Sequence, residues 1–169
     1  MKIIALDPSL VAFGWSILDS DTNELVDAGC IETHPIKFLP KYKSNIKRLN
    51  EITEKLNDLF IKYPDISFGY SEIPVGSKSS SAATALASVQ GIIIALFHVH
   101  LSLNYEFIMP RDVKKTLTFN QNATKDQLVE VVKNSIPNFR SVVGKTNKVR
   151  LYAISDAIAV YLALEKKKI

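Results

Sequence analysis

Three short apolar segments at the start of the chain follow one another too closely for a helix to connect them. They span Lys2–Leu6, Phe13–Leu18 and Leu25–Ile31, and each has the length and composition of a buried strand. The second connection, Asp19–Asn23, consists of turn-forming residues. Parallel neighbours need a crossover of about a dozen residues or more. We therefore expect these strands to form an antiparallel meander that opens a sheet.

Helices and strands alternate after the meander. Apolar residues recur at helical spacing from Ser44 to about Tyr63, and Pro64 ends that helix. The other expected elements are strands Ile66–Ile73 and Asn104–Met109, helices Ala82–Val99, Arg111–Leu117, Lys125–Ser135 and Leu151 to about Lys166, and a basic loop Arg140–Arg150. This order predicts an α/β fold whose central five-stranded mixed sheet is flanked by helices. We find no linker or repeat and expect one domain over residues 1–169.

Composition narrows the class of protein. Cys30 is the only cysteine, so no disulfide within the chain and no cysteine-based zinc site is expected. The longest apolar run, around Ile92–Phe97, is too short to cross a bilayer, and no signal peptide is recognised at the N-terminus. We therefore expect a cytoplasmic protein without a membrane partner.

Basic residues are clustered rather than evenly spread. The net charge is only +4, from 21 Lys and Arg against 17 Asp and Glu. The clusters lie at Lys37–Arg48, Lys114–Lys115, Lys145–Arg150 and Lys166–Lys168. This distribution favours an anionic partner, although the last cluster is equally typical of a solvated helix end.

Three acidic residues stand alone within apolar segments. Asp7 ends the first strand, Glu72 lies near the end of the fourth, and Asp156 interrupts the apolar last helix. A buried carboxylate is costly without a partner. Each alone is more often a cap or one half of an ion pair, but together the three could converge on divalent metal ions, as phosphodiester hydrolysis requires.

The order of these segments resembles that of the RuvC-type Holliday-junction resolvases. Ile3–Trp15, with Asp7-Pro8-Ser9, is similar to their opening strand and hairpin. Tyr70-Ser71-Glu72 resembles the approach to their second acid, and Ser155–Ala159 resembles their acidic last helix. The segments Asp112–Thr116 and Ala123–Gln127 resemble two lysine-bearing segments of that family. The resemblance covers nearly the whole chain, and its strength lies in the ordered combination of motifs.

The resemblance implies a ribonuclease-H-like fold, a homodimer, and a four-way or otherwise branched DNA substrate. It implies two Mg²⁺ ions per site, for which Mn²⁺ can substitute, held by Asp7, Glu72 and Asp156. Lys125 would assist catalysis and would contact DNA together with Lys114, although both could instead be ordinary exposed lysines. The further DNA-contact candidates are Lys78, Arg111, Lys145 and Lys148.

Two positions depart from the family pattern. Family members usually carry an acid or a histidine three residues before the last Asp, where this chain has Ala153. Our hypothesis is that Ala153 is an engineered inactivating substitution; the alternative is a natural loss. Val75 stands where many relatives have an aromatic residue that stacks on a base, so base stacking is not expected there. Phe38 and Phe119 lie in loops, but we expect each to be part of the core.

Other functions fit some of these features. An actin-like ATPase also opens with a strand and an Asp, but it needs a second glycine-rich phosphate loop, for which Asp27-Ala28-Gly29 is a poor candidate among only 6 glycines. A non-catalytic protein that binds branched DNA is a stronger alternative because of Ala153. A general ribonuclease H is the third. A bacterial or phage-encoded source is compatible with all of these.

Overall fold

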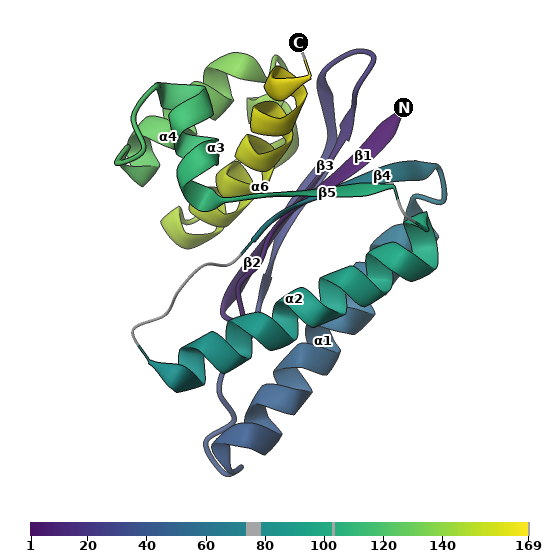
Figure 1. Cartoon of the computed structure of the whole chain (residues 1–169), viewed down its shortest axis with the longest axis vertical. Coiled ribbons are helices and arrows are strands. Elements are labelled where there is room, and N and C mark those ends of the chain that lie inside the picture. Colours follow the sequence, from purple (N-terminus) through teal and green to yellow (C-terminus); the bar gives the residue numbers. More distant parts are fainter. Residues whose placement is uncertain (74–78, 103, 169) are drawn as a thin grey trace.

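The computed structural model describes residues 1–73, 79–102 and 104–168, which form a layered α/β fold (Figure 1). Its strands are β1 (Lys2–Asp7), β2 (Ala12–Asp19), β3 (Glu24–Glu32), β4 (Ile66–Glu72) and β5 (Tyr105–Ile108). Its helices are α1 (Lys41–Lys62), α2 (Ser80–Leu101), α3 (Pro110–Thr118), α4 (Lys125–Ser135), α5 (Phe139–Val143) and α6 (Lys148–Lys167).

The five strands form one mixed sheet in the order β3-β2-β1-β4-β5. β1, β2 and β3 pair antiparallel, which confirms the expected meander, and Asp7 lies opposite Gly14 in that ladder. β4 pairs parallel to β1, with Leu6 opposite Ser71, and β5 pairs parallel to β4. The carboxyl ends of β1 and β4 therefore meet at the same edge of the sheet.

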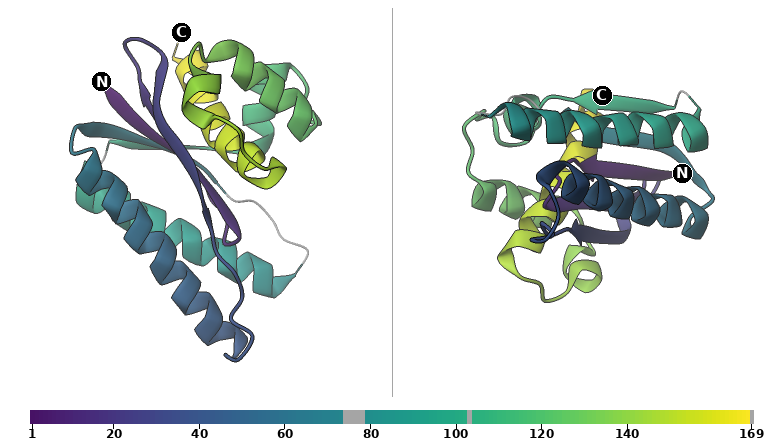
Figure 2. Two further views of the ribbon diagram at one scale, coloured as in Figure 1. Left: turned by 180° about the vertical axis from the view of Figure 1, so that it is seen from behind. Right: turned by 90° about the horizontal axis from the view of Figure 1, so that it is seen from below.

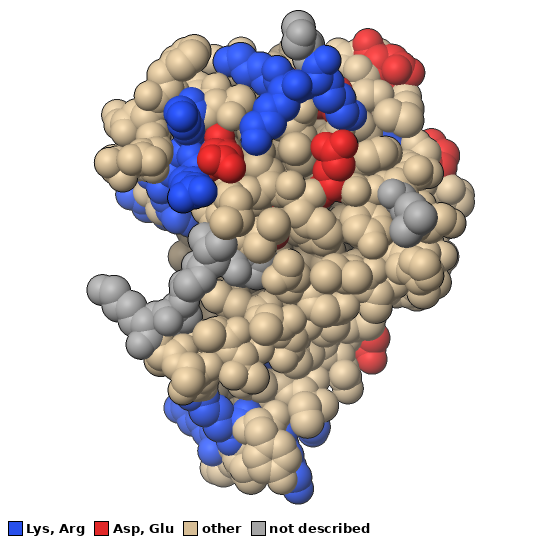
Figure 3. Space-filling model, in the orientation of Figure 1, with Lys and Arg blue, Asp and Glu red and all other residues tan. Residues whose placement is uncertain are grey.

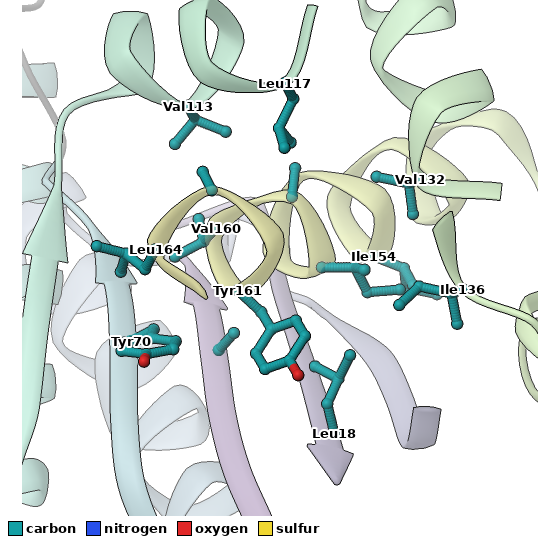
Figure 4. Close-up of a cluster of buried hydrophobic side chains, with 14 of the residues drawn as sticks. Leu18, Tyr70, Val113, Leu117, Val132, Ile136, Ile154, Val160, Tyr161 and Leu164 are labelled. Carbon is teal, nitrogen blue, oxygen red and sulfur yellow. The ribbon is translucent and has the colours of Figure 1, made fainter. Parts of the chain in front are cut away.

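Helices cover both faces of the sheet (Figure 2). The alternation of side chains along β1 sends Ile4 and Leu6 toward α1 and α2, and sends Ile3 and Ala5 toward the layer of α3 to α6. In this second layer, α6 lies against the sheet and its Tyr161 packs close to Leu18 (Figure 4). Burial on both faces is what fixes the position of each strand end.

The segment before α6 differs from expectation. The prediction of a basic loop over Arg140–Arg150 was wrong, because this segment holds part of α5 and the first turn of α6, which begins at Lys148. Long-range contacts explain α5, since the Asn138 side chain accepts a hydrogen bond from the Leu25 N–H and donates one to the Leu25 carbonyl, both at 2.9 Å. The Asn147 side chain caps α6 by accepting from the Arg150 N–H.

Helix α2 also differs from expectation. Ser80–Leu101 is 22 residues long with a hydropathy of 1.8, enough by length and composition alone to cross a membrane. The interpretation of this region as too short, based on the run Ile92–Phe97, was therefore wrong about its length. One face of α2, including Val89 and Phe97, is buried against the sheet, whereas Ile94 and Val99 are 41% and 74% exposed.

Phe38 and Phe119 are on the surface, so the expectation that they belong to the core was wrong. Phe38 is 96% exposed and Phe119 is 87% exposed. Phe119 caps the C-terminus of α3 in the left-handed conformation, with φ of 57°. Val113 and Leu117 already supply the buried side of that helix, so Phe119 is left outside.

At Gly14 the backbone of α6 comes so close to the sheet that no side chain fits. A Cβ atom at this position would lie 2.0 Å from the Ala153 carbonyl oxygen. We expect Gly14→Ala to push α6 away from β2 and to lower the free energy of unfolding by about 3 kcal/mol, as overpacking against rigid backbone does.

Urea unfolding of Gly14→Ala and Gly29→Ala would test this expectation. A Cβ atom at Gly29, in the same sheet, would meet only the Trp15 side chain, at 2.5 Å, and a side chain can rotate away. Equal losses of stability in the two variants would contradict the importance of the α6 contact.

Candidate active site

Three carboxylates from separate elements line one cavity. Asp7 is the last residue of β1, Glu72 is the last residue of β4, and Asp156 lies on α6. The cavity has a volume of about 210 Å³, and its remaining lining consists of Pro110, Val113, Lys114, Lys125 and Leu128. The structure thus brings together the three acids and both principal lysines that the sequence singled out.

The pairing of the strands explains why the acids meet. Because β1 and β4 are parallel neighbours, their last residues emerge side by side. Asp156 reaches the same edge because α6 crosses the sheet in contact with Gly14, the residue opposite Asp7 in the ladder. The site therefore depends on one strand pairing and one close helix–sheet contact.

Burial makes these carboxyl groups hard to ionise. Burial, followed by the nearby charges of Asp156 and Glu72, holds the pKa of Asp7 well above its usual range. Burial and the charge of Asp156 raise the pKa of Glu72 to about 7. Without added positive charge, the site therefore tends to retain protons.

Lys125 supplies positive charge at this site. Its Nζ lies 2.7 Å from Asp156 Oδ2, and the two side chains are 55% and 16% exposed. Burial raises the pKa of Asp156, and Lys125 offsets part of that effect. The side chain is well placed because Lys125 begins α4, whose start is fixed by a capping box between Thr124 and Gln127. Lys125 is thus paired with Asp156, and its role in catalysis stays a prediction.

The chemistry of the donor set fits a hard divalent cation. Three carboxylates that repel one another in a small cavity need positive charge, and oxygen ligands are those that such cations prefer. As the side chains stand within the described ranges, however, no three His, Cys, Asp or Glu residues already form a metal-ligand set. Lys125, paired with Asp156, provides part of the compensating charge in this arrangement.

Ala153 lies one turn of α6 before Asp156 and is 4% exposed. Its backbone is in contact range of Gly14, so the position is beside the end of β1 where Asp7 lies. A methyl group there supplies no oxygen ligand. The position at which the family usually has a fourth ligand therefore lies next to the site. This placement does not distinguish an engineered Ala153 from a natural one.

The weaker DNA-contact candidates lie outside the cavity. Arg111 is exposed and 3.8 Å from Asp112, and Lys148 is exposed and 3.8 Å from Asp126. Lys145 is exposed between α5 and α6. Lys78 and Val75 lie outside the described residues.

Tyr152 is a residue of this site that sequence reasoning missed. Its ring lies 5.5 Å from Lys125 Nζ, and its hydroxyl donates to Asp126 Oδ1 at 2.6 Å. It therefore helps to hold the start of α4 over the carboxylates. The available signal was its position four residues before Asp156, which places both on one side of a helix.

The fold and the site together define a class of protein. A mixed sheet in this order, with carboxylates at the ends of its central parallel strands and on a helix that crosses it, is a ribonuclease-H-like nuclease domain. Residues 3–164 match the family described as crossover junction endodeoxyribonuclease RuvC. The chain belongs to the RuvC family, and its class of enzyme is endodeoxyribonuclease.

Curated RuvC proteins are similar in sequence to this chain along nearly its whole length. The RuvC of Ehrlichia ruminantium (strain Welgevonden) is 33% identical over 165 residues, covering 95% of this chain and 93% of the relative. The RuvC of Brachyspira hyodysenteriae is 26% identical and covers 96% and 92%. Among solved structures, T. thermophilus RuvC in complex with a Holliday junction substrate superposes with a TM-score of 0.77 at 15% identity, covering 99% of this chain and 94% of that one. This last likeness shows the fold alone.

The raised pKa of Glu72 predicts how stability depends on pH. Because the folded chain holds the Glu72 proton more tightly than the unfolded chain, stability without divalent ions should fall as the pH rises from about 4.5 to about 7. Glu72→Gln removes that ionisation and should raise the free energy of unfolding at pH 7.5 by on the order of 2 kcal/mol. Urea unfolding at pH 5 and pH 7.5 measures both effects.

The matched control is Glu24→Gln, which removes a carboxylate from an exposed position on β3. It should leave the pH dependence unchanged. Addition of Mg²⁺ at pH 7.5 should stabilise the unsubstituted chain more than Glu72→Gln. Equal stabilisation of both would contradict a metal-binding role for Glu72.

Proposed function

We propose that this protein resolves four-way DNA junctions by hydrolysing phosphodiester bonds at the cavity that holds Asp7, Glu72 and Asp156. The observation that carries the proposal is the convergence of these carboxylates with Lys114 and Lys125 in a chain of the RuvC family. The names of the relatives support crossover junctions as the substrate, and a structural neighbour was solved with a Holliday junction. Since the relatives are bacterial, we place its action in the bacterial cytoplasm.

Asp7, Glu72 and Asp156 would hold the divalent metal, which we propose to be two Mg²⁺ ions, replaceable by Mn²⁺. Bound metal supplies Lewis acidity toward the phosphate and helps to deprotonate the attacking water. Metal charge would also offset the repulsion that keeps the pKa values of Asp7 and Glu72 high.

The other residues of the cavity position the substrate. Lys114 and Lys125 present ammonium groups beside the carboxylates, where they would bind the phosphate and stabilise the charge that develops on it. Val113 and Leu128 form an apolar wall that limits access of water. Arg111, which is exposed outside the cavity, and Lys78, which is outside the described residues, are proposed to contact the DNA backbone.

Ala153 favours a second candidate function. With no fourth oxygen ligand on α6, metal binding would be weakened, and the chain would bind branched DNA better than it cuts it. If cleavage were lost completely, the chain would be a non-catalytic protein that binds DNA junctions.

Cleavage assays with a panel of substrates test the proposal. Four-way junctions, flaps, Y-forms, plain duplexes and RNA–DNA hybrids would be incubated with Mg²⁺ or Mn²⁺ and with either the unsubstituted chain or Ala153→Asp. We expect four-way junctions to be cut in preference to the rest, and Ala153→Asp to raise the rate about tenfold or more by completing the ligand set.

Asp156→Asn in the Ala153→Asp background is the control for contaminating nuclease, and it should abolish the gain. Junction binding without cleavage in every variant would establish the non-catalytic function instead. Preferential cleavage of RNA–DNA hybrids would indicate a ribonuclease H. No gain with Ala153→Asp would overturn the idea that position 153 lost a ligand.

Helix α2 supports a homodimer. Its 22 residues contain no Asp, Glu, Lys or Arg, yet the side away from the sheet is open in a single chain. Small residues at Ala83, Ala87 and Gly91 recur along that exposed side, next to Ile94. An apolar strip of this kind suits the same strip of a second copy across a two-fold axis, and two related active sites suit the symmetric strands of a junction.

Ile94→Asp should convert the dimer to a monomer, because a carboxylate would be buried between two copies of α2. The matched control is Ile61→Asp on α1, where the side chain is 68% exposed. Analytical ultracentrifugation measures the mass of both variants. Retention of the dimer by Ile94→Asp, or its loss in Ile61→Asp, would place the interface elsewhere.

A further inference from the structure

Lysines and aromatic residues share an exposed surface at the start of α1, which we call the basic tip. Phe38 is 96% exposed and Tyr42 is 62% exposed. The basic tip consists of Lys37, Phe38, Lys41, Tyr42, Lys43 and Lys47, all exposed. Basic side chains gather at that lower end of the molecule in Figure 3, away from those over α3 and α4.

Within the described residues, no ion pair balances the charge of the basic tip. No Asp or Glu occurs between Glu32 and Glu51. The ion pairs formed by α1 in the described chain involve Lys55 and Lys62, which lie toward its other end. The first turn of α1 holds no acid and no side-chain cap. Lysines at a helix N-terminus oppose the helix dipole, so this arrangement costs stability unless an anion binds there.

Hydrogen bonds fix the start of α1 to the preceding loop and to the segment that follows Asp7. The Ser44 hydroxyl accepts a hydrogen bond from the Ile36 N–H at 2.9 Å and closes the preceding loop. Arg48 is buried and donates to the Thr33 hydroxyl at 2.8 Å and to the Leu10 carbonyl at 2.9 Å. Leu10 follows Asp7 by three residues.

The basic tip and the loop that follows β1 line one cavity. Lys41 precedes Arg48 by seven residues, or about 10 Å along α1 at the usual helical rise. A cavity of about 340 Å³ between α1 and α2 is lined by Lys41 at one side and by Ser9, Leu10 and Val11 at the other. A strand with a phosphate every ~3.4 Å would pass several phosphates over this span.

We propose that the basic tip binds an arm of the branched DNA outside the cleavage site. The lysines contact backbone phosphates of that arm, and Phe38 and Tyr42 pack against its sugars and against bases that are unpaired where the arm leaves the branch point. This inference rests on the proposed function, because it assumes that branched DNA occupies the carboxylate site. The carboxylate site binds the strand to be cut, whereas the basic tip orients the arm that leaves it.

The salt dependence of DNA binding tests this surface. Each duplex phosphate that the protein no longer neutralises lowers the slope of log affinity against log salt by about 0.9. We expect K41Q/K43Q to lower the slope for a four-way junction by up to about 1.8. The control K55Q/K62Q removes the same charge from the other end of α1 and should leave the slope unchanged. Fluorescence anisotropy with labelled junctions measures both.

Phe38→Ala tests the aromatic contact with no change of charge. We expect affinity for a four-way junction to fall about fivefold or more, the usual loss for a stacked base. Affinity for a blunt duplex should change less, because its bases are paired. Circular dichroism would confirm that the variant is folded, and no loss of junction affinity would overturn the aromatic part of the inference.

The remaining outcomes separate this inference from the proposed function. If the unsubstituted chain prefers junctions but K41Q/K43Q keeps its full salt slope, the basic tip does not bind DNA and an acidic protein partner is the better explanation. If K41Q/K43Q changes the mass of the protein in solution, the occupant is a second copy. If the unsubstituted chain shows no preference for junctions, the proposed function itself fails.

Discussion

The burial of three carboxylates in one cavity is the constraint on which the rest of this structure depends. Asp7, Glu72 and Asp156 repel one another, and removal from water adds to that cost. The fold tolerates the arrangement because Lys125 lies against Asp156 and because the raised pKa values of Asp7 and Glu72 favour their uncharged forms. Because the repulsion between the carboxylates is relieved by positive charge, the site is suited to bind cations. Metal-dependent hydrolysis of phosphodiesters requires bound cations of this kind.

A close contact between α6 and the sheet holds this arrangement in place. α6 approaches the sheet at Gly14, where there is no room for a side chain, and this approach brings Asp156 to the ends of β1 and β4. Capping of α4 by Thr124 and Gln127 then fixes Lys125, and the Tyr152 ring supports it. Ala153 stands in the same contact, so a position at which this chain departs from its family lies where the geometry is tightest.

Expectations from the sequence failed where long-range contacts decided the outcome. The helical turn at Phe139–Val143 depends on Asn138 binding the backbone of β3, more than a hundred residues away. Phe38 and Phe119 were assigned to the core because they are apolar, but both are on the surface, and at Phe119 the buried side of α3 is already supplied by Val113 and Leu117. Helix α2 was judged by its most apolar run rather than by its whole length. Each error came from treating a segment without its neighbours.

The sequence by itself determined the order of the strands and of the helices other than α5, the antiparallel meander and the identity of the three acids. These follow from short connections, from apolar periodicity and from the cost of isolated charges, which are all local properties. Only the tertiary structure decided that the acids share one cavity, that Lys125 pairs with Asp156, and that an aromatic, basic surface lies open at the start of α1. Those features depend on which side chains meet across the sheet, and a one-dimensional pattern does not contain that information.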